Sequence, residues 1–227
     1  MSDDPVLQAL ALRALSFVPD DATVGLGSGR AALAFVRALG VRVRQGLRVR
    51  GVPTSETTAA EARACGIPLV GLDLVADITV TIDGADEVAP NLDLIKGYGG
   101  ALVREKIVAA ASQREVILVG REKLVPVLGA RGIVPVEVVQ FGAPFCARRI
   151  TALGWHATLR RVGGTPFVSD GGNYILDCGV APLTNPHSFE TAVRTIPGVI
   201  DTGLFLGVAD CVLVGDDTGV RELRRPV

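Results

Sequence analysis

The chain has 227 residues, enough for one large domain or for a large and a small one. Its composition is 48% hydrophobic and 21% charged, which predicts a packed core and argues against disorder. The 23 basic and 24 acidic residues leave a formal net charge of -1, which favours neither nucleic acid nor an anionic membrane surface as a partner.

Targeting and cysteine patterns point to the cytoplasm. The first residues are acidic and lack the basic-then-apolar order of a signal peptide, and no apolar stretch is long enough to span a bilayer. The cysteines are scattered and form no C-x-x-C pair: Cys65, Cys146, Cys178 and Cys211. They indicate neither a zinc site nor a disulfide framework. We therefore expect a cytoplasmic protein that needs no metal and no cofactor.

Strands alternate with helices in the first half of the chain. Apolar periodicity and turn residues predict helices at 5–17, 30–39, 55–65 and 101–112, and strands at 22–25, 48–52, 68–70, 80–82 and 115–119. This alternation predicts a parallel sheet covered by helices on both faces.

The order of elements changes after residue 130. Expected next are a strand at 134–139, a helix at 144–153, strands at 156–161 and 173–177, a helix at 186–196 and a strand at 199–205. This β-α-β-β-α-β order is typical of a ferredoxin-like unit, and a last strand from residue 211 is expected to rejoin the first sheet. The fold class is therefore α/β: a Rossmann-like parallel-sheet domain with an inserted ferredoxin-like α+β domain. The predicted boundaries are 1–130 with 207–227 for the first domain and 131–206 for the second.

A glycine-rich loop, Gly-Leu-Gly-Ser-Gly at 25–29, joins the first strand to a helix. Glycines let the backbone approach an anion, and a helix N-terminus presents free N–H groups to it. A dinucleotide site needs a third glycine where Arg30 stands and an acid where the second strand ends in Arg50-Gly51-Val52-Pro53, so we do not expect a nicotinamide cofactor. A phosphate site, a sugar-hydroxyl site and a tight turn without ligand are the alternatives.

Acidic residues and a glycine run mark the centre of the chain. Asp83 ends an apolar strand, and ligands of parallel sheets bind at the carboxyl ends of strands. Asp86 follows after a tight turn, Lys96 precedes the glycine run at 97–100, and Glu105 lies in the first turns of the next helix. This set suits proton transfer beside a carbonyl, in which one carboxylate abstracts the proton while lysine and backbone amides hold the oxyanion.

Alternatives apply to several of these charges. Asp83 can instead cap a turn, and Glu87 and Asp93 are expected to be solvated loop charges. Carboxylates also suit magnesium, but Lys96 already supplies positive charge to the cluster. Only three basic residues are lysines, and Lys96 and Lys123 are candidates for positions that need a compact point charge.

The central segments, residues 83–87, 95–97, 100–102 and 104–107, resemble the signature of the ribose-5-phosphate isomerase A family. The resemblance extends over essentially the whole chain, through 25–29, 54–56 and 66–68 in the first half and 135–138, 170–177 and 196–199 in the second. It implies reversible conversion of D-ribose 5-phosphate to D-ribulose 5-phosphate in the non-oxidative pentose phosphate pathway. It also implies a metal-independent homodimer or homotetramer that binds a small sugar phosphate.

The resemblance also implies residue roles. Glu105 corresponds to the catalytic base, Asp83 to a carboxylate that assists ring opening, Lys96 with the neighbouring amides to the oxyanion site, and Lys123 to a phosphate ligand. The predicted catalytic residues are Glu105, Asp83, Lys96 and Asp86. The predicted substrate-binding residues are Gly27, Ser28, Gly29, Arg30, Ala31, Gly84, Ala85, Gly97, Tyr98, Gly99 and Lys123.

The chain departs from the family pattern mainly at the phosphate end. Arg30 and Ala31 replace two hydroxyl residues, Leu7 replaces a lysine, and Tyr98 replaces a glycine. We therefore keep two alternatives: an isomerase of a related sugar or sugar phosphate, and a non-catalytic sugar-phosphate-sensing domain of the kind attached to bacterial repressors. Retention of Glu105 together with Lys96 favours catalysis.

Overall fold

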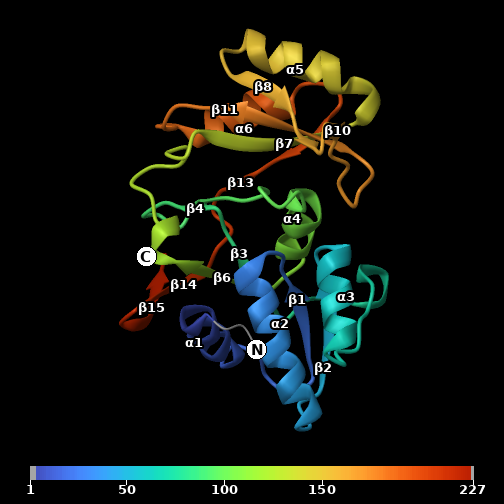
Figure 1. Ribbon diagram of the computed structural model, residues 1–227, viewed down its shortest axis with the longest axis vertical. Helices are drawn as coiled ribbons and strands as arrows, with labels where there is room; N and C mark the ends of the chain where they lie inside the picture. The colour runs from blue at the N-terminus through green and yellow to red at the C-terminus, as the bar shows by residue number, and fades with distance from the viewer. Residues whose placement is uncertain (1–3, 226–227) are drawn as a thin grey trace. The chain divides into compact units, whose positions relative to one another are not determined.

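The computed structural model describes residues 4–225, which divide into two compact units (Figure 1). The first unit comprises the residues up to Ala85, Arg104–Leu124 and the residues from Val208 on, and the second comprises Asp86–Val103 and Val125–Gly207. The second unit thus includes residues 86–103 and 125–130, which the sequence analysis assigned to the larger domain. The reason is tertiary pairing, because β5 (Leu94–Ile95) pairs antiparallel with β13 (Leu204–Phe205).

A six-stranded sheet in the order β15-β14-β6-β3-β1-β2 forms the centre of the first unit. Its strands are β1 (Ala22–Leu26), β2 (Val49–Pro53), β3 (Val80–Gly84), β6 (Glu115–Gly120), β14 (Cys211–Asp216) and β15 (Gly219–Arg224). All neighbours pair in parallel except the edge strand β15, which pairs antiparallel with β14. The tail therefore rejoins the sheet, as predicted. The strand expected at 68–70 is only a bridge between Gly51 and Leu69.

Helices cover both faces of this sheet. They are α1 (Pro5–Leu15), α2 (Arg30–Arg44), α3 (Glu56–Ala64) and α4 (Leu102–Ala110), with short 3₁₀ turns η1 (Leu72–Leu74) and η2 (Arg121–Lys123). Because side chains alternate along a strand, Val24 and Ile82 pack in one core with α1 and α2, which lie side by side (Figure 1). Gly25 and Thr81 face the opposite way, toward Val108 of α4. The prediction of a doubly covered parallel sheet is confirmed.

The second unit contains a four-stranded antiparallel sheet in the order β12-β7-β11-β8. Its elements follow the chain as β7 (Ile133–Val138), η3 (Gln140–Gly142), α5 (Ala143–Ala152), β8 (His156–Leu159), β11 (Tyr174–Gly179), α6 (Pro186–Arg194) and β12 (Val199–Thr202). This is the predicted β-α-β-β-α-β order. Two smaller sheets accompany it, formed by β4 (Glu87–Val88), β5 and β13, and by β9 (Arg161–Val162) and β10 (Thr165–Pro166).

Two acidic residues of the second unit contradict the expectation of solvated loop charges. Glu87 is 0% exposed, and its carboxylate accepts hydrogen bonds from the N–H groups of Gly129 and Arg131, each at 2.7 Å. Asp93 is also buried and accepts a hydrogen bond from the N–H of Gly207 at 2.8 Å. Buried carboxylates are tolerated when hydrogen bonds replace water. These partners lie far along the chain, so local charge patterning did not reveal them.

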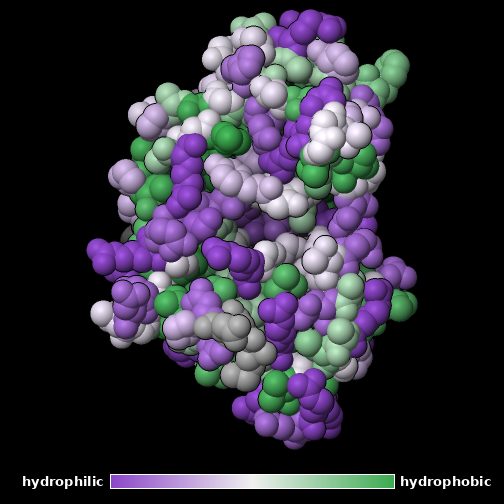
Figure 2. Space-filling model, viewed as in Figure 1, coloured by the Kyte–Doolittle hydropathy of each residue, from purple (hydrophilic) through white to green (hydrophobic). Residues whose placement is uncertain are grey.

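The surface shows no large segregation of polar and apolar residues on the face drawn in Figure 2, where the two kinds are interspersed. No helix within the described residues is long and apolar enough to cross a membrane. Large exposed apolar side chains occur on several elements, such as Leu12 of α1 and Phe141 of η3, and some are near neighbours in sequence, as Val139, Phe141 and Phe145 are.

Candidate active site

Four neighbouring strands of the first unit end in glycine-rich or polar turns. Gly27 and Ser28 follow β1, Thr54 follows β2, Asp83 lies near the end of β3, and Lys123 lies in η2 directly after β6. The strands β2, β1, β3 and β6 are parallel neighbours, so their carboxyl ends share one edge of the sheet. The sheet topology therefore gathers residues that are distant in sequence at one candidate site.

Asp83 is held at this edge by the loop after β1. Its carboxylate is 1% exposed, and Oδ1 accepts hydrogen bonds from the N–H groups of Ser28 at 3.0 Å and Gly84 at 2.7 Å. A Cβ atom at Gly27 would lie 2.2 Å from Oδ1 and 2.5 Å from Cα of Asp83. Gly27 is therefore required because Asp83 occupies the space of a side chain.

The same loop is supported by a hydroxyl cluster, which comprises Ser28, Thr54, Ser55 and Thr58. Oγ of Ser28 lies 2.8 Å from Oγ1 of Thr54 and from Oγ of Ser55, and Ser55 donates to Thr58 at 2.9 Å. Thr58 in turn donates to the carbonyl oxygen of Gly27 at 2.9 Å. The hydroxyl of Ser28 thus points into the scaffold, and Ser28 supports Asp83 through its backbone N–H.

Sequence reasoning missed the hydroxyl cluster as part of the site. The segment 54–56 was identified through the family resemblance, and Ser55 caps α3 by accepting the N–H of Thr58 at 3.1 Å. One sequence feature does indicate a role beyond the cap, because several hydroxyl residues are concentrated at the end of β2. Nothing in the sequence, however, places that end beside the loop after β1.

Glu105 comes to the same edge on α4. It is 6% exposed and lies in the first turn of the helix, one turn before Val108. Val108 packs on the sheet, since a Cβ atom at Gly25 would lie 2.8 Å from its Cγ1. Residues three apart share a helix face, and a helix joining parallel strands runs antiparallel to them. Glu105 therefore lies toward the carboxyl ends of the strands, where Asp83 lies.

The predicted phosphate end lies at the N-terminus of α2. Gly29 precedes the helix with a φ of 90°, a conformation that favours glycine. Arg30 is the first helical residue and is exposed, whereas Ala31 is half-buried and packs against the core. Arg30 therefore adds a positive charge at a helix end whose N–H groups attract anions. Lys123 is half-buried after β6.

The remaining predicted residues belong to the second unit. Lys96 is 2% exposed, and its Nζ lies 5.4 Å from the ring centroid of Phe205. Asp86 accepts a hydrogen bond through Oδ2 from the N–H of Tyr98 at 3.0 Å. Burial, reinforced by the carboxylates of Glu87 and Asp86, raises the pKa of Tyr98 to about 12. The phenol is therefore a neutral anchor at physiological pH.

The glycine run forms a tight turn. The N–H of Gly100 donates to the carbonyl oxygen of Gly97 at 3.0 Å, and these two glycines have φ values of 87° and 97°. Left-handed φ values at both ends explain why glycine is needed there. Gly99 lies at the exposed tip of the turn. Because the N–H groups of Tyr98 and Gly100 are engaged in hydrogen bonds, the amide of Gly99 is the candidate donor to a ligand.

The predicted residues are thus distributed over the two units. The first unit contains Asp83, Glu105, Lys123, Gly84, Ala85 and residues 27–31, and the second contains Asp86, Lys96 and residues 97–99. Within residues 4–225, no group of three or more His, Cys, Asp or Glu side chains is arranged to hold a metal ion. The carboxylates near Asp83 do not form such a group.

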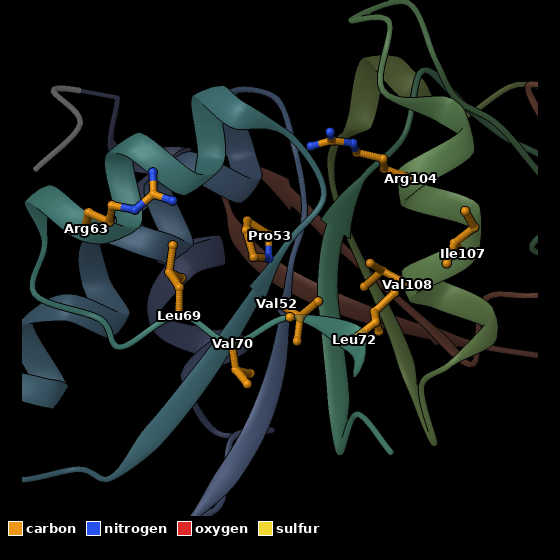
Figure 3. Close-up of a pocket in the computed structure, with 10 residues that line it drawn as sticks. Val52, Pro53, Arg63, Leu69, Val70, Leu72, Arg104, Ile107 and Val108 are labelled. Atoms are coloured by element: carbon orange, nitrogen blue, oxygen red, sulfur yellow. The ribbon is translucent and has the colours of Figure 1, made fainter. Parts of the chain in front are cut away.

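A cavity of about 480 Å³ lies elsewhere in the first unit (Figure 3). Its lining includes Val52 and Pro53 of β2, Arg63 of α3, and Arg104 and Ile107 of α4. None of the site residues predicted in the described part of the chain lines this cavity. Its apolar side chains carry none of the proposed chemistry, so we place the candidate site at the strand ends instead.

Comparisons with known proteins show which family the chain belongs to. The family model described as Ribose 5-phosphate isomerase A (phosphoriboisomerase A) matches residues 50–219. Ribose-5-phosphate isomerase A of Gloeobacter violaceus is 50% identical over 98% of this chain and 97% of its own length, and that of a Roseiflexus species is 47% identical over 100% and 98%.

Solved structures are similar over their full length. Ribose 5-phosphate isomerase A from Methanocaldococcus jannaschii has a TM-score of 0.93 and 36% identity, and the match covers 98% of this chain and 100% of that one. A D-ribose-5-phosphate isomerase in complex with phospho-erythronic acid has a TM-score of 0.94 and 37% identity, over 99% and 100%. This chain therefore belongs to the ribose-5-phosphate isomerase A family and is an isomerase.

Proposed function

We propose that this enzyme interconverts D-ribose 5-phosphate and D-ribulose 5-phosphate, with Glu105 as the base that moves the proton. The observation that carries the proposal is the placement of two buried carboxylates, Glu105 and Asp83, at the carboxyl edge of one parallel sheet. Membership of the family supports the substrate and the reaction.

The reaction moves one proton between adjacent carbons of the open-chain sugar. The carboxylate of Glu105 takes the proton from C2 of the aldose and returns it to C1. The carbonyl passes from C1 to C2 through an enediolate as the proton of the C2 hydroxyl is transferred to the oxygen on C1. Asp83 assists ring opening by exchanging a proton with a sugar oxygen. Lys96 and the amides of the glycine run stabilise the negative charge on the enediolate oxygen. Asp86 contributes by holding the N–H of Tyr98 in that run.

The phosphate is bound by positive charge and free amides. The N-terminus of α2 presents backbone N–H groups and a favourable dipole, and Arg30 adds a guanidinium that can bind phosphate through two hydrogen bonds. Lys123 supplies a second charge from the end of β6. The lysine expected in the first helix is replaced by Leu7, which packs against the core. Arg30 takes over part of that role in our proposal.

We also propose a cytoplasmic homodimer or homotetramer that acts in the non-oxidative branch of the pentose phosphate pathway. The altered phosphate end favours one second candidate, an isomerase of a related sugar or sugar phosphate. The third alternative, a non-catalytic sensing domain, disagrees with membership of the isomerase family.

A substrate panel distinguishes these functions. The enzyme is incubated with D-ribose 5-phosphate, free D-ribose and other five- and six-carbon aldose phosphates, and ketose formation is measured. The expected result is the highest kcat/KM for D-ribose 5-phosphate. A higher value for another sugar would establish the second candidate, and no turnover of any sugar would overturn the proposal. Dialysis against a strong chelator should leave activity unchanged, and a loss restored by a divalent ion would show that the carboxylates hold a metal.

A further inference from the structure

An arginine of the ferredoxin-like part holds the glycine run in place. Arg160 directly follows β8, and its side chain is only 13% exposed. Its Nη1 donates to the carbonyl oxygens of Gly97 at 2.9 Å and Tyr98 at 3.0 Å. One guanidinium nitrogen therefore joins two successive peptide groups of the turn that is proposed to hold the oxyanion.

The guanidinium is itself fixed on its other side. Nε and Nη2 of Arg160 donate to the two carboxylate oxygens of Asp177 at 3.0 and 2.5 Å, which is a bidentate pair. The ring of Phe167 lies 5.9 Å from the guanidinium carbon, and the N–H of Phe167 donates to the carbonyl oxygen of Arg160 at 2.9 Å. A planar group with both ends engaged has little freedom to move, so it is a rigid support for the turn.

Because the peptide bond is planar, the contacts of Arg160 with the carbonyls also determine where the neighbouring N–H groups point. In a trans peptide the carbonyl and the following N–H point in opposite directions. The carbonyls of Gly97 and Tyr98 point to Arg160, so the N–H groups of Tyr98 and Gly99 point away from it. The N–H of Tyr98 does so, because it donates to Asp86 on the other side of the turn. By the same geometry the N–H of Gly99 faces away from Arg160 at the exposed tip.

The contact has an electrostatic consequence as well. A cation bound to a carbonyl oxygen polarises the peptide group and strengthens the N–H on the same plane as a hydrogen-bond donor. Phe167 also limits the turn, since a Cβ atom at Gly100 would lie 2.4 Å from its ring. Arg160 and Phe167 thus set the position of the turn, and Arg160 also sets the polarity of its amides.

We infer that Arg160 is a positioning residue for the isomerase reaction: it aims and polarises the Gly99 amide toward the enediolate oxygen. The inference rests on the proposed function, because that function supplies the oxyanion. Arg160 was not among the residues predicted from the sequence. It follows a strand of the inserted domain and lies far along the chain from the glycine run.

Three variants test the inference. Arg160→Met approximately keeps the length of the side chain and removes both the positive charge and the planar guanidinium with its N–H donors. It should lower kcat by about 100-fold, the scale of losing one oxyanion donor, with KM for D-ribose 5-phosphate within about threefold. Arg160→Lys keeps the positive charge but not the planar guanidinium, and should lower kcat about tenfold. The matched control is Arg161→Met, because the guanidinium of Arg161 donates to Gly164 in the exposed hairpin. The kcat of this control should stay within about twofold of the value for the unmodified enzyme.

Two further measurements separate positioning from general destabilisation. Inhibition by phospho-erythronic acid should weaken in parallel with kcat/KM across the variants, as expected for a group that acts on the transition state. Hydrogen exchange of the peptide containing residues 97–100 should accelerate in Arg160→Met and not in Arg161→Met. Saturable rescue of the Arg160→Met kcat by added guanidinium would support the same role.

The outcomes are distinguishable from failure of the proposed function. If the unmodified enzyme does not turn over D-ribose 5-phosphate, the proposed function is wrong. Hydrogen exchange alone then tests whether Arg160 holds the glycine run in place. If it does, an Arg160→Met kcat within about threefold of normal, or unchanged exchange at 97–100, overturns the inference. If Arg160→Met does not fold, Asp177→Asn tests the inference instead. This substitution leaves Arg160 in place and weakens the bidentate pair that fixes its guanidinium. A severalfold loss of kcat is expected, and an unchanged kcat contradicts the inference.

Discussion

The loop after β1 and the run at 97–100 are both rich in glycine, and they are held by different chemistry. Neutral hydroxyls support the first loop, where Thr58 donates to the carbonyl of Gly27 and Ser28 joins the cluster. A guanidinium supports the second, through the carbonyls of Gly97 and Tyr98. The first loop directs the N–H of Ser28 at the protein's own carboxylate, Asp83, whereas in our proposal the Gly99 amide of the second loop binds an external oxyanion.

Two glycines, one from each loop, differ in the space around them. Gly27 has no room for a side chain because Asp83 occupies the space. At Gly99, by contrast, an added Cβ would meet no described atom within 4 Å. Glycine content alone therefore does not identify a ligand-binding loop. What distinguishes the loops is the chemistry of the groups that hold them and the direction of their amides.

The largest expected effect belongs to the proposed base, Glu105. Glu105→Gln keeps the shape of the side chain and removes its basicity, so kcat should fall at least about 100-fold with little change in thermal stability. Initial rates with D-ribose 5-phosphate measure this fall in kcat. The falls caused by substitutions in either loop are then compared with it. Glu56→Gln, on an exposed first-turn glutamate of the neighbouring helix, is the control. Near-normal turnover by Glu105→Gln would remove Glu105 from the mechanism.

A pair of glycine substitutions tests the comparison itself. Gly27→Ala must displace Asp83, so kcat/KM should fall up to about 100-fold and the free energy of unfolding by about 1–3 kcal/mol. Gly99→Ala meets open space and should remain within about threefold in kcat/KM and close to normal in stability. Steady-state kinetics and denaturant unfolding give both quantities. Equal effects of the two substitutions would break the proposed difference between the loops.

Arg30→Ala tests whether the first loop also has an external ligand. If Arg30 binds phosphate, KM for the phosphorylated sugar should rise about tenfold, the scale of one charge-assisted contact, while weak activity on free D-ribose is unchanged. Arg42→Ala, in the last turn of the same helix, is the control. An unchanged KM, or an equal loss on both sugars, would assign the first loop to scaffolding alone.

The smallest expected effect concerns the anchor of the second loop. The pKa of Tyr98 is raised to about 12, above the value of about 10 for an unfolded chain. Between these values the unfolded chain has lost the phenol proton and the folded chain has not, so folding stability falls as pH rises. Tyr98→Phe loses the hydrogen bond to the carbonyl of Ile133. It should be slightly less stable at about pH 8 and should close that gap toward about pH 11. A gap that stays constant in unfolding experiments would contradict this.

The sequence by itself determined most elements and predicted the candidate catalytic residues. Alternating and helical apolar patterns are local properties, so they located the parallel sheet, the β-α-β-β-α-β unit and the returning tail. The end of an apolar strand also placed Asp83 at a ligand-binding edge, and the family resemblance assigned Glu105 and Lys96. The elements and the position of Asp83 needed only short-range order in the chain and rules of chain topology that hold for any parallel sheet.

Only the tertiary structure decided how the loops are supported and which charges are buried. Ser55 and Thr58 reach the first loop because β2 pairs with β1, and Arg160 reaches the second because of where β8 lies in its sheet. Glu87 and Asp93, expected in solvent, are buried by backbone amides far along the chain. The physical reason is common to all of them. A hydrogen bond depends on the separation of two atoms in space, and apolar periodicity does not encode the separation of residues that are distant in sequence.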